Sequence, residues 1–544
     1  MLNAGICGFI KFLEHNNADE NNDYKISGQT LYISKEYLKN NENMGMKYVN
    51  TMAEIFDESS GHKKFLSRIH NKVKILENVN IADLDENLLK ECIKDLNEYA
   101  DKMLMASKIS VYNFLNEYDD IIPITREPFD KIKKSNDLSE KYEIYKETLK
   151  LIEQPTIRKL LVYTELLYGK FKLFFNENSQ QKKITYLCEK DKRYDITYNK
   201  SFYELLLAEI EEDEKKKNSR CIECMGNMKH KKDFTFLIDT ADDLNRKKSY
   251  YWNCTPDAFV CPLCAFVYTF IPLGFLFFGG DALFVNANNN IKYLKGINQK
   301  TADEDSFANR RLLRIFTDEK INAMENVESN VQVILHSNDY SHFRFDIIDV
   351  QTIRHLRNGK KYLNNLEKIN KNKTFNFGTP NDLHIYDIVF DHIYMHQSFY
   401  GIIDRIMKHE FDNNFDYLKN ILYLENIFYG GEKMEELNKK VRNAHVVGKE
   451  LRKSILGENA HNSGKEDDNK LRGVVYRLLN LTAVGDRSQF IDTVLRIYTG
   501  YNLTIPSIFK DCYQSDEMFK AISHGFILGL KYVPYNEKEN KNDE

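Results

Sequence analysis

The sequence predicts an α+β multidomain protein in which two mainly helical regions flank a four-cysteine module and a small mixed α/β segment. Three observations support this prediction. The chain has 544 residues, which is enough for about three or four domains of ordinary size. Two CxxC pairs lie near its middle, and helical patterns of apolar residues dominate on both sides of them. The apolar fraction of 42% is sufficient for several packed cores.

Composition narrows the functional class. The net charge of −4, from 77 basic and 81 acidic residues, is unlike that of a histone or ribosomal protein. Any nucleic-acid binding must therefore depend on local basic patches. Nine cysteines are sparse and odd in number, which argues against a disulfide framework. The first residues lack the basic segment of a signal peptide, so we expect a cytoplasmic protein.

The first predicted domain covers residues 1–215 and is mixed but mainly helical. Apolar residues share one face of a predicted helix over Ala4–Glu14. A β-hairpin is predicted over Tyr24–Ile33, turning at Ser27 and Gly28. Ser34 is a suitable N-cap for the helix that follows. From there to the end of this domain the pattern of apolar residues is mostly helical.

The second predicted domain, residues 216–290, is a zinc-binding module. Its ligands are Cys221 and Cys224 in one CxxC pair, and Cys261 and Cys264 in the other. Two thiolates separated by two residues on a tight turn can bind the same ion, and two such turns complete a tetrahedron of sulfur ligands that suits Zn²⁺. A site closed by four cysteines is structural, because it leaves no coordination position for substrate.

Two alternatives remain for this module. Cys254 or His230 can replace one of the four cysteines as a ligand, and a redox-active CxxC pair would need a thioredoxin-like βαβ context that the sequence lacks.

The apolar stretch from Ala258 to Gly280 has the length of a membrane span. Its cysteines, prolines and glycines instead predict a buried strand–turn–strand or a short helix within the protein core.

Two further domains are predicted after the module. Residues 291–384 form a mixed α/β segment, in which Val331–Leu335 and Phe343–Ile348 have the composition of strands. Residues 385–544 form a C-terminal helical bundle. We expect Tyr429–Gly431 and a polar loop over 457–469 to interrupt its helices.

Basic residues cluster at several points of this net-acidic chain. A solvated surface is the ordinary explanation for any one cluster, but their number favours binding to the phosphates of a nucleic acid. One cluster, next to Tyr250–Trp252, combines charge with rings that can stack on bases. The candidate nucleic-acid-binding residues are Lys231, Lys232, Arg246, Lys247, Lys248, Arg310, Arg311, Arg314, Arg472, Arg477, Arg487 and Arg496. A further cluster consists of Arg354, His355, Arg357, Lys360 and Lys361.

We expect the protein not to be an enzyme, because its sequence contains no recognisable catalytic motif. Asp391, His392 and His396 lie at nearly helical spacing, but such a set is more often structural than metal-binding. Two alternatives stay open. The first is a metal-dependent nuclease acting on DNA or RNA, and the second is an architectural zinc protein that binds proteins only.

Several motifs, taken in chain order, resemble one family. They are Asn3–Ile6 with Gly8–Phe9, the CxxC pair at Cys221, the CPLC sequence at Cys261, Ile271–Phe275 and Phe284–Asn288. This set resembles the CXXC–CXXC family of CRISPR-associated proteins, whose members are the large subunit of the type I-B Cascade effector complex.

The resemblance implies a non-catalytic role in antiviral defence. It also implies that the C-terminal bundle over residues 385–544 is similar to the separate small subunit of the complex. A large subunit of this kind contacts the 5′ region of the crRNA and recognises a short motif beside the target in double-stranded DNA. It also docks a helicase–nuclease. The implied partners are therefore crRNA, target double-stranded DNA, the Cascade backbone and small subunits, and the helicase–nuclease. No membrane is implied. Base pairing with the guide supplies the sequence specificity in such a system.

Overall fold

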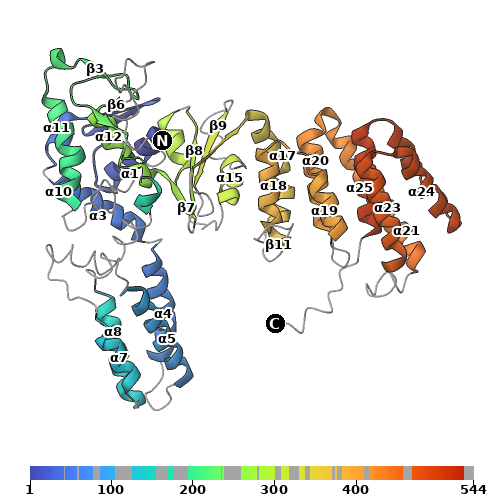
Figure 1. Ribbon diagram of the computed structural model, residues 1–544, viewed down its shortest axis with the longest axis horizontal. Coiled ribbons are helices and arrows are strands. Elements are labelled where there is room, and N and C mark those ends of the chain that lie inside the picture. The colour runs from blue at the N-terminus through green and yellow to red at the C-terminus, as the bar shows by residue number, and fades with distance from the viewer. Residues whose placement is uncertain are drawn as a thin grey trace, which may run out of the picture. The chain divides into compact units, whose positions relative to one another are not determined.

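A computed structural model describes most of the chain. The described residues are 1–41, 43–57, 60–77, 86–103, 125–135, 137–154, 170–175, 194–234, 236–237, 259–278, 281–288, 290–299, 308–317, 330–336, 343–369, 374–375, 383–409, 416–457 and 468–531. The chain divides into two compact units. Unit 1 comprises residues 1–302 and 334–344, and unit 2 comprises residues 303–333 and 345–544. Small antiparallel sheets accompany many helices, which confirms the predicted α+β multidomain class (Figure 1).

Helix α1 (Leu2–His15) is the centre of unit 1 and packs against α12 (Pro262–Tyr268) and α13 (Ile271–Gly274). Its glycines allow the backbones to touch. A Cβ atom added to Gly5 would lie 2.6 Å from the carbonyl oxygen of Val267, and one added to Gly8 would collide with the carbonyl of Phe270. Only glycine lets helices approach this closely.

The predicted hairpin and its following cap are both confirmed. Strands β1 (Tyr24–Ser27) and β2 (Thr30–Ile33) pair in antiparallel fashion, and Gly28 in their turn has a φ of +58°. This backbone conformation favours glycine. The hydroxyl of Ser34 accepts a hydrogen bond from the backbone N–H of Tyr37, so it caps α2 as the sequence predicts.

Most other described elements of the first 216 residues are helical. They are α2 (Lys35–Lys39), α3 (Met44–Asp57), α4 (Gly61–Glu77), α5 (Glu86–Met103), α7 (Glu127–Lys134), α8 (Leu138–Ile152), η3 (Phe171–Leu173), α10 (Tyr194–Tyr198), the π-helical η4 (Asn199–Tyr203), α11 (Glu204–Glu211) and η5 (Glu214–Lys216). Aromatic rings fill the core that α3, α10 and α12 share. The ring of Tyr48 stacks on Tyr198 at 4.4 Å, and both hydroxyls bond to Thr269.

The cysteine module combines short strand pairs with the two helices that pack on α1. β3 (Ser219–Arg220) pairs with β4 (Asn227–Met228), and β5 (Lys232–Asp233) pairs with β6 (Phe259–Val260). The apolar stretch around residues 259–278 therefore folds as β6, α12, α13 and β7 (Leu276–Phe278), and it lies in the core as predicted. In the described part of the chain no helix is long and apolar enough to cross a membrane.

A four-stranded sheet follows the module, and its strand order is β10-β9-β8-β7. The predicted strands are confirmed as β9 (Val331–His336) and β10 (Arg344–Ile348). The remaining elements of this region are β8 (Asp281–Asn286), α14 (Ile291–Ile297), α15 (Ala308–Thr317), α17 (Val350–Ile369), β11 (Thr374–Phe375) and β12 (Leu383–His384).

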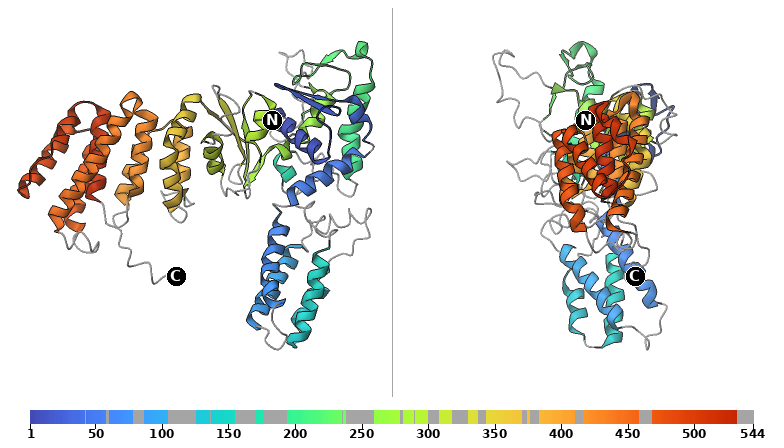
Figure 2. Two further views of the ribbon diagram at one scale, coloured as in Figure 1. Left: turned by 180° about the vertical axis from the view of Figure 1, so that it is seen from behind. Right: turned by 90° about the vertical axis from the view of Figure 1, so that its right-hand side faces the viewer.

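Unit 2 ends in a helical bundle, which Figure 2 shows from two further sides. Its elements are α18 (Ile385–Tyr394), α19 (Tyr400–His409), α20 (Asp416–Tyr429), η7 (Gly431–Lys433), α21 (Met434–Leu456), α23 (Asp468–Val484), α24 (Arg487–Gly500), η8 (Ser507–Tyr513) and α25 (Asp516–Leu530). The predicted interruption at Tyr429–Gly431 is present between α20 and α21, whereas most of the predicted loop over 457–469 lies outside the described residues.

Helix α25 is the most deeply buried part of the bundle, with every residue from Ala521 to Leu530 buried. It crosses α21 where Gly529 of α25 meets Gly448 of α21. A Cβ atom on Gly529 would lie 2.8 Å from the Cα atom of Gly448 and 2.9 Å from the backbone nitrogen of Lys449. This close packing positions the outer helices α20 and α23, which both contact α25.

Candidate metal centre

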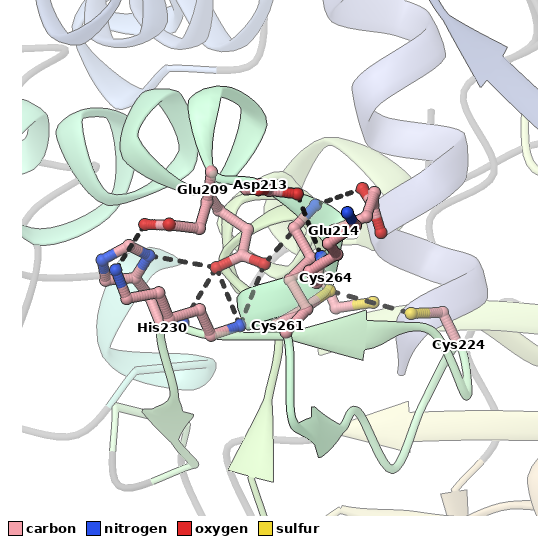
Figure 3. Close-up of polar contacts among 11 residues, drawn as sticks. Glu209, Asp213, Glu214, Cys224, His230, Cys261 and Cys264 are labelled. Atoms are coloured by element: carbon pink, nitrogen blue, oxygen red, sulfur yellow. Dashed lines mark hydrogen bonds and ion pairs between the residues drawn. The ribbon is translucent and has the colours of Figure 1, made fainter.

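The four predicted ligands lie together in unit 1. The sulfur atoms of Cys221, Cys224, Cys261 and Cys264 all lie within 4.8 Å of one another. The Cys224 and Cys261 sulfurs are 3.7 Å apart (Figure 3). A tetrahedral ion with metal–sulfur bonds of ~2.3 Å requires sulfur–sulfur separations of roughly 3.8 Å. The donor set and its spacing therefore fit one soft divalent cation.

The first CxxC pair lies on a tight turn between β3 and β4. The backbone N–H of Cys221 donates to the carbonyl of Gly226 (2.9 Å), and the N–H of Met225 donates to the carbonyl of Cys221 (3.0 Å). Met225 has a φ of +58°, a left-handed conformation that turns the chain back towards β4. A Cβ atom on Gly226 would lie 3.3 Å from the Cys224 sulfur, so glycine leaves room for that ligand.

The second pair lies at the start of a helix. Cys261 is the N-cap of α12, and its sulfur accepts from the backbone N–H of Cys264 (3.4 Å). Pro262 fits the first turn of the helix because the missing N–H would have no partner there. The backbone N–H of Cys261 donates to the sulfur of Cys221 (3.2 Å), so the second turn supports a ligand of the first.

The pKa values of the cysteine thiols show that the sulfur atoms interact strongly and would be stabilised by a bound cation. Hydrogen bonds from the Cys261 and Cys264 thiols lower the pKa of Cys224 well below its ordinary value. The hydrogen bond to the Cys224 sulfur, together with burial, raises the pKa of both Cys261 and Cys264. A bound cation would replace the protons that these two thiols hold, since metal ligands must be thiolates.

A buried carboxylate holds the strand that follows the first turn. Glu209 on α11 is 8% exposed, and it accepts from the backbone N–H groups of Lys229 and His230. It also bonds to the His230 ring at Nδ1 (3.0 Å). The ring of His230 is thus engaged with Glu209, so the alternative of a histidine ligand is not supported. The other alternative, Cys254, lies outside the described residues.

Glu209 is a site residue that the sequence prediction missed. Its place in the acidic-then-basic run from Glu209 to Lys217 gave it the appearance of a solvated helix end. The signal for its role is its spacing from Leu206, three residues earlier, which places both side chains on the buried face of α11.

Basic residues of the module have separate roles. Lys231 lies over the ring of Phe259 (5.4 Å), and Lys232 lies over the ring of Phe202 (5.0 Å). Such contacts stabilise the module by a modest amount, and they leave the exposed Lys231 available to a ligand. The predicted contacts Arg246, Lys247 and Lys248 lie outside the described residues, as does Tyr250–Trp252.

The arginines of α15 do not form one exposed surface. The predicted helix is present, but Arg311 is only 4% exposed, because it lies on the face that packs into unit 2. It is therefore corrected from a surface contact to a core residue. Arg314 is exposed, and the side chain of Arg310 is not among those described.

The four C-terminal arginines also fail to form a single row. Arg487 and Arg496 are nine positions apart on α24, which places them about 180° apart around the helix. Arg487 forms an ion pair with Asp516 of α25, and Arg496 pairs with Asp492 (3.0 Å). Arg472 and Arg477 are both exposed on α23. Salt bridges thus account for two of the four predicted phosphate contacts.

The Asp391, His392 and His396 set has structural partners. The Nδ1 atom of His392 faces the carbonyl of Ser398 (3.2 Å), and His396 faces Asp349 (3.7 Å). Within the described residues, the four cysteines are the one group of three or more His, Cys, Asp or Glu side chains arranged to hold a metal ion.

These observations define the class of site as a closed four-cysteine centre that can hold a structural metal ion. Residues 214–276, which contain all four cysteines, match the model of a family described as CRISPR-associated protein (Cas_CXXC_CXXC). The match supports a CRISPR-associated role and a relationship to proteins with two CxxC pairs. No curated protein and no solved structure matches the chain.

Proposed function

We propose that this chain is the non-catalytic large subunit of a crRNA-guided, type I-B CRISPR interference complex. In this role it contacts the 5′ region of the crRNA, binds target double-stranded DNA and recognises the motif beside the target. It also contacts the Cascade backbone and small subunits and docks the helicase–nuclease. The observation that carries the proposal is the family match over residues 214–276, which includes both cysteine pairs.

The packing of unit 1 supports this proposal, because it joins the other motifs of the resemblance to the matched segment. The Asn3 side chain donates to the side chains of Asn286 (2.8 Å) and Asn288 (2.6 Å). The Lys11 ammonium donates to the carbonyls of Leu273 and Asn298, both at 2.9 Å. Motifs nearly 300 residues apart in the sequence therefore belong to one packed core that includes the cysteine module.

The metal of this centre is, in our proposal, Zn²⁺ bound by Cys221, Cys224, Cys261 and Cys264. When bound, the ion supplies folding free energy rather than reaction chemistry. It would fix the start of α12, and α12 in turn packs against α1. The chain's own residues then maintain the shape of unit 1 for binding to RNA, DNA and protein partners.

The closed set of four cysteine ligands supports the proposal of a non-enzymatic role. Four sulfur ligands leave no open position on Zn²⁺ for a water or a phosphate oxygen. The carboxylate and histidine groups that a nuclease alternative would use, Asp391 and His392, belong to a helix whose histidine is held by Ser398. We therefore expect no cleavage of DNA or RNA by the isolated chain with Mg²⁺, Mn²⁺ or Zn²⁺.

Affinity purification from the native host tests the proposal. A tagged chain should recover RNAs that carry repeat-derived 5′ ends together with several protein subunits in fixed ratio. Recovery of the chain without guide RNA would contradict the proposal. Divalent-dependent cleavage lost in Asp391→Asn or His392→Ala would favour the nuclease alternative, whereas recovery of proteins alone would favour an architectural zinc protein.

A further inference from the structure

Between residues 351 and 368, one face of helix α17 in unit 2 carries only polar and cationic side chains. The residues that form it recur at intervals of three and four positions, which keeps them within an arc of about 100° around the helix. All of them are at least partly exposed. They are Gln351, Arg354, Asn358, Lys361, Asn365 and Lys368, and we call them the α17 stripe.

The opposite face of α17 holds the helix in place. Ile353, Leu356 and Leu363 are buried there. Gly359 lies against Leu424 of α20, where a Cβ atom would be 2.8 Å from the Leu424 side chain. The stripe therefore points away from the core of the bundle because the helix is amphipathic.

Two other cations of α17 are structural. The Nε atom of Arg357 donates to the carbonyl of Phe316 (3.0 Å), and the ammonium of Lys360 donates to the carbonyl of Thr317 (3.3 Å). These carbonyls end α15, where the helix has no further N–H groups of its own to bond them. Positive charge at a helix C-terminus is also favourable. Arg357 and Lys360 thus fasten α15 to α17, which explains their presence without any ligand.

The three cations of the stripe have no such role. Among the described residues, no hydrogen bond or ion pair engages Arg354, Lys361 or Lys368. From residue 350 to residue 366 the helix contains no acidic residue at all, although the chain as a whole has a net charge of −4. An uncompensated row of cations with a polar surface between them is suited to a polyanion.

The spacing of the row matches a nucleic-acid backbone. Arg354, Lys361 and Lys368 are seven residues apart, which is about 10.5 Å of helix. Three steps along one strand of a nucleic-acid duplex span roughly 10 Å along its axis. The amide side chains between the cations can donate hydrogen bonds to phosphate or sugar oxygens.

We propose that the α17 stripe is a phosphate-binding surface that tracks the backbone of a nucleic acid. The inference rests on the proposed function for the kind of partner, a nucleic acid. The stripe holds Arg354, Lys361 and Lys368 against phosphates about three steps apart on one strand, while Gln351, Asn358 and Asn365 contact the same strand. Its contacts are independent of base sequence because they reach only the backbone.

The test compares full-length wild type with the triple variant Arg354→Ala, Lys361→Ala, Lys368→Ala. Binding is measured against single-stranded RNA and duplex DNA of unrelated sequences across a salt series. Loss of three phosphate contacts should weaken binding roughly 100-fold at 0.1 M salt and reduce the log–log salt slope by about 2 to 3. The RNA and DNA arms identify which nucleic acid the stripe holds.

The matched control removes the same number of charges from the same unit. Lys433, Lys439 and Arg442 lie exposed in and near α21, and the first turn of that helix carries Glu435 and Glu436, so acidic side chains lie among these cations, unlike in the stripe. Their triple alanine variant should keep the wild-type slope. The charge-conserving variant Arg354→Lys, Lys361→Arg, Lys368→Arg should also bind, which separates loss of charge from loss of folding.

Each outcome has a distinct meaning. If wild type binds neither RNA nor DNA, the proposed function fails together with this inference. If wild type binds and the stripe variant binds with the same affinity and slope, the stripe assignment is wrong while the proposed function stands. If stripe and control variants weaken binding equally, only net charge matters and the inference is again overturned.

Discussion

At the residue scale, the metal centre depends on a small number of backbone details. The spacing of the CxxC pairs is sufficient to predict which cysteines meet, because each pair needs only a local turn to aim both sulfurs at one point. The left-handed backbone of Met225 and the space beside Gly226 complete the first turn. Each sulfur therefore has little freedom before an ion binds.

Substitution of one exposed ligand tests the centre without creating a cavity. Cys224→Ser should reduce the metal content from about one ion per chain to nearly none, because three thiolates do not complete the tetrahedron. Unfolding should become easier by several kcal/mol, on the order expected when metal-binding energy contributes to folding. Metal analysis and thermal denaturation provide the measurement.

The control for this variant is Ile222→Ser in the same turn, since the Ile222 side chain is 42% exposed and offers no ligand. It should keep its metal and most of its stability. A Cys224→Ser protein that retains one ion per chain would exclude the proposed ligand set.

Acidification should destabilise unit 2 through His445. Burial, and secondarily the charges of Lys419 and Lys449, lower the pKa of His445 to about 3. In the unfolded chain the pKa of histidine is ~6.5. Between these values the unfolded state binds more protons, so the free energy of unfolding decreases as the pH falls. From pH 7 to pH 5 this group should remove about 2 kcal/mol.

Denaturant unfolding at pH 7 and pH 5 measures this effect. His445→Gln should lose that share of the pH dependence, because glutamine does not titrate. If the free energy of unfolding depends on pH equally in wild type and in His445→Gln, then His445 does not contribute to that dependence.

At the scale of elements, glycines decide which helices touch. Gly5, Gly8 and Gly274 bring α1 against α12 and α13, while Gly448, Gly525 and Gly529 bring α21 against α25. In both places a side chain would meet backbone atoms, which cannot move aside as a flexible side chain can. These close crossings fix the cores of the two units.

Gly529→Ala should destabilise the bundle by about 2 kcal/mol or more, since its Cβ atom would meet the backbones of His445, Gly448 and Lys449. Gly473→Ala on the exposed side of α23 is the matched control, because a Cβ atom added there would have no neighbouring heavy atom within 4 Å. That substitution should be neutral or stabilising by up to ~1 kcal/mol. Urea denaturation compares them, and equal stabilities would contradict the close crossing.

Element boundaries followed from local sequence signals, but surface assignments did not. The hairpin at Gly28, the cap at Ser34 and the strands β9 and β10 each depend on neighbouring residues, so they could be predicted. Whether an arginine is exposed depends on what packs against its helix. Arg311 and Arg314 are three residues apart on α15, yet the first is buried and the second is exposed.

Lys368 belongs to the α17 stripe, although the sequence analysis did not include it in the basic cluster around Arg354 and Lys361. It lies seven residues after Lys361, and that spacing was visible in the sequence. Its place in the stripe depends on α17 being one continuous helix from Val350 to Ile369. Arg357 and Lys360, which the sequence analysis grouped with Arg354 and Lys361, instead contact the end of α15.

At the scale of the whole molecule, the two units divide the work of the proposed function. Unit 1 contains the metal centre and the segment over residues 214–276 that matches the family model. Unit 2 contains the α17 stripe and the C-terminal bundle, whose exposed Arg477 remains a candidate for phosphate contact. We expect unit 2 to hold nucleic acid without regard to sequence, so discrimination of the target-adjacent motif should depend on unit 1.

Reconstitution of the guide complex with and without this chain tests the proposed function most directly. Binding is measured on duplex targets that carry or lack the target-adjacent motif and are otherwise identical. We predict that the complete complex prefers the motif-bearing duplex by at least about tenfold, and that the preference disappears when this chain is omitted, because base pairing with the guide does not depend on the motif. A complex without this chain that prefers the motif equally well would contradict the proposed function.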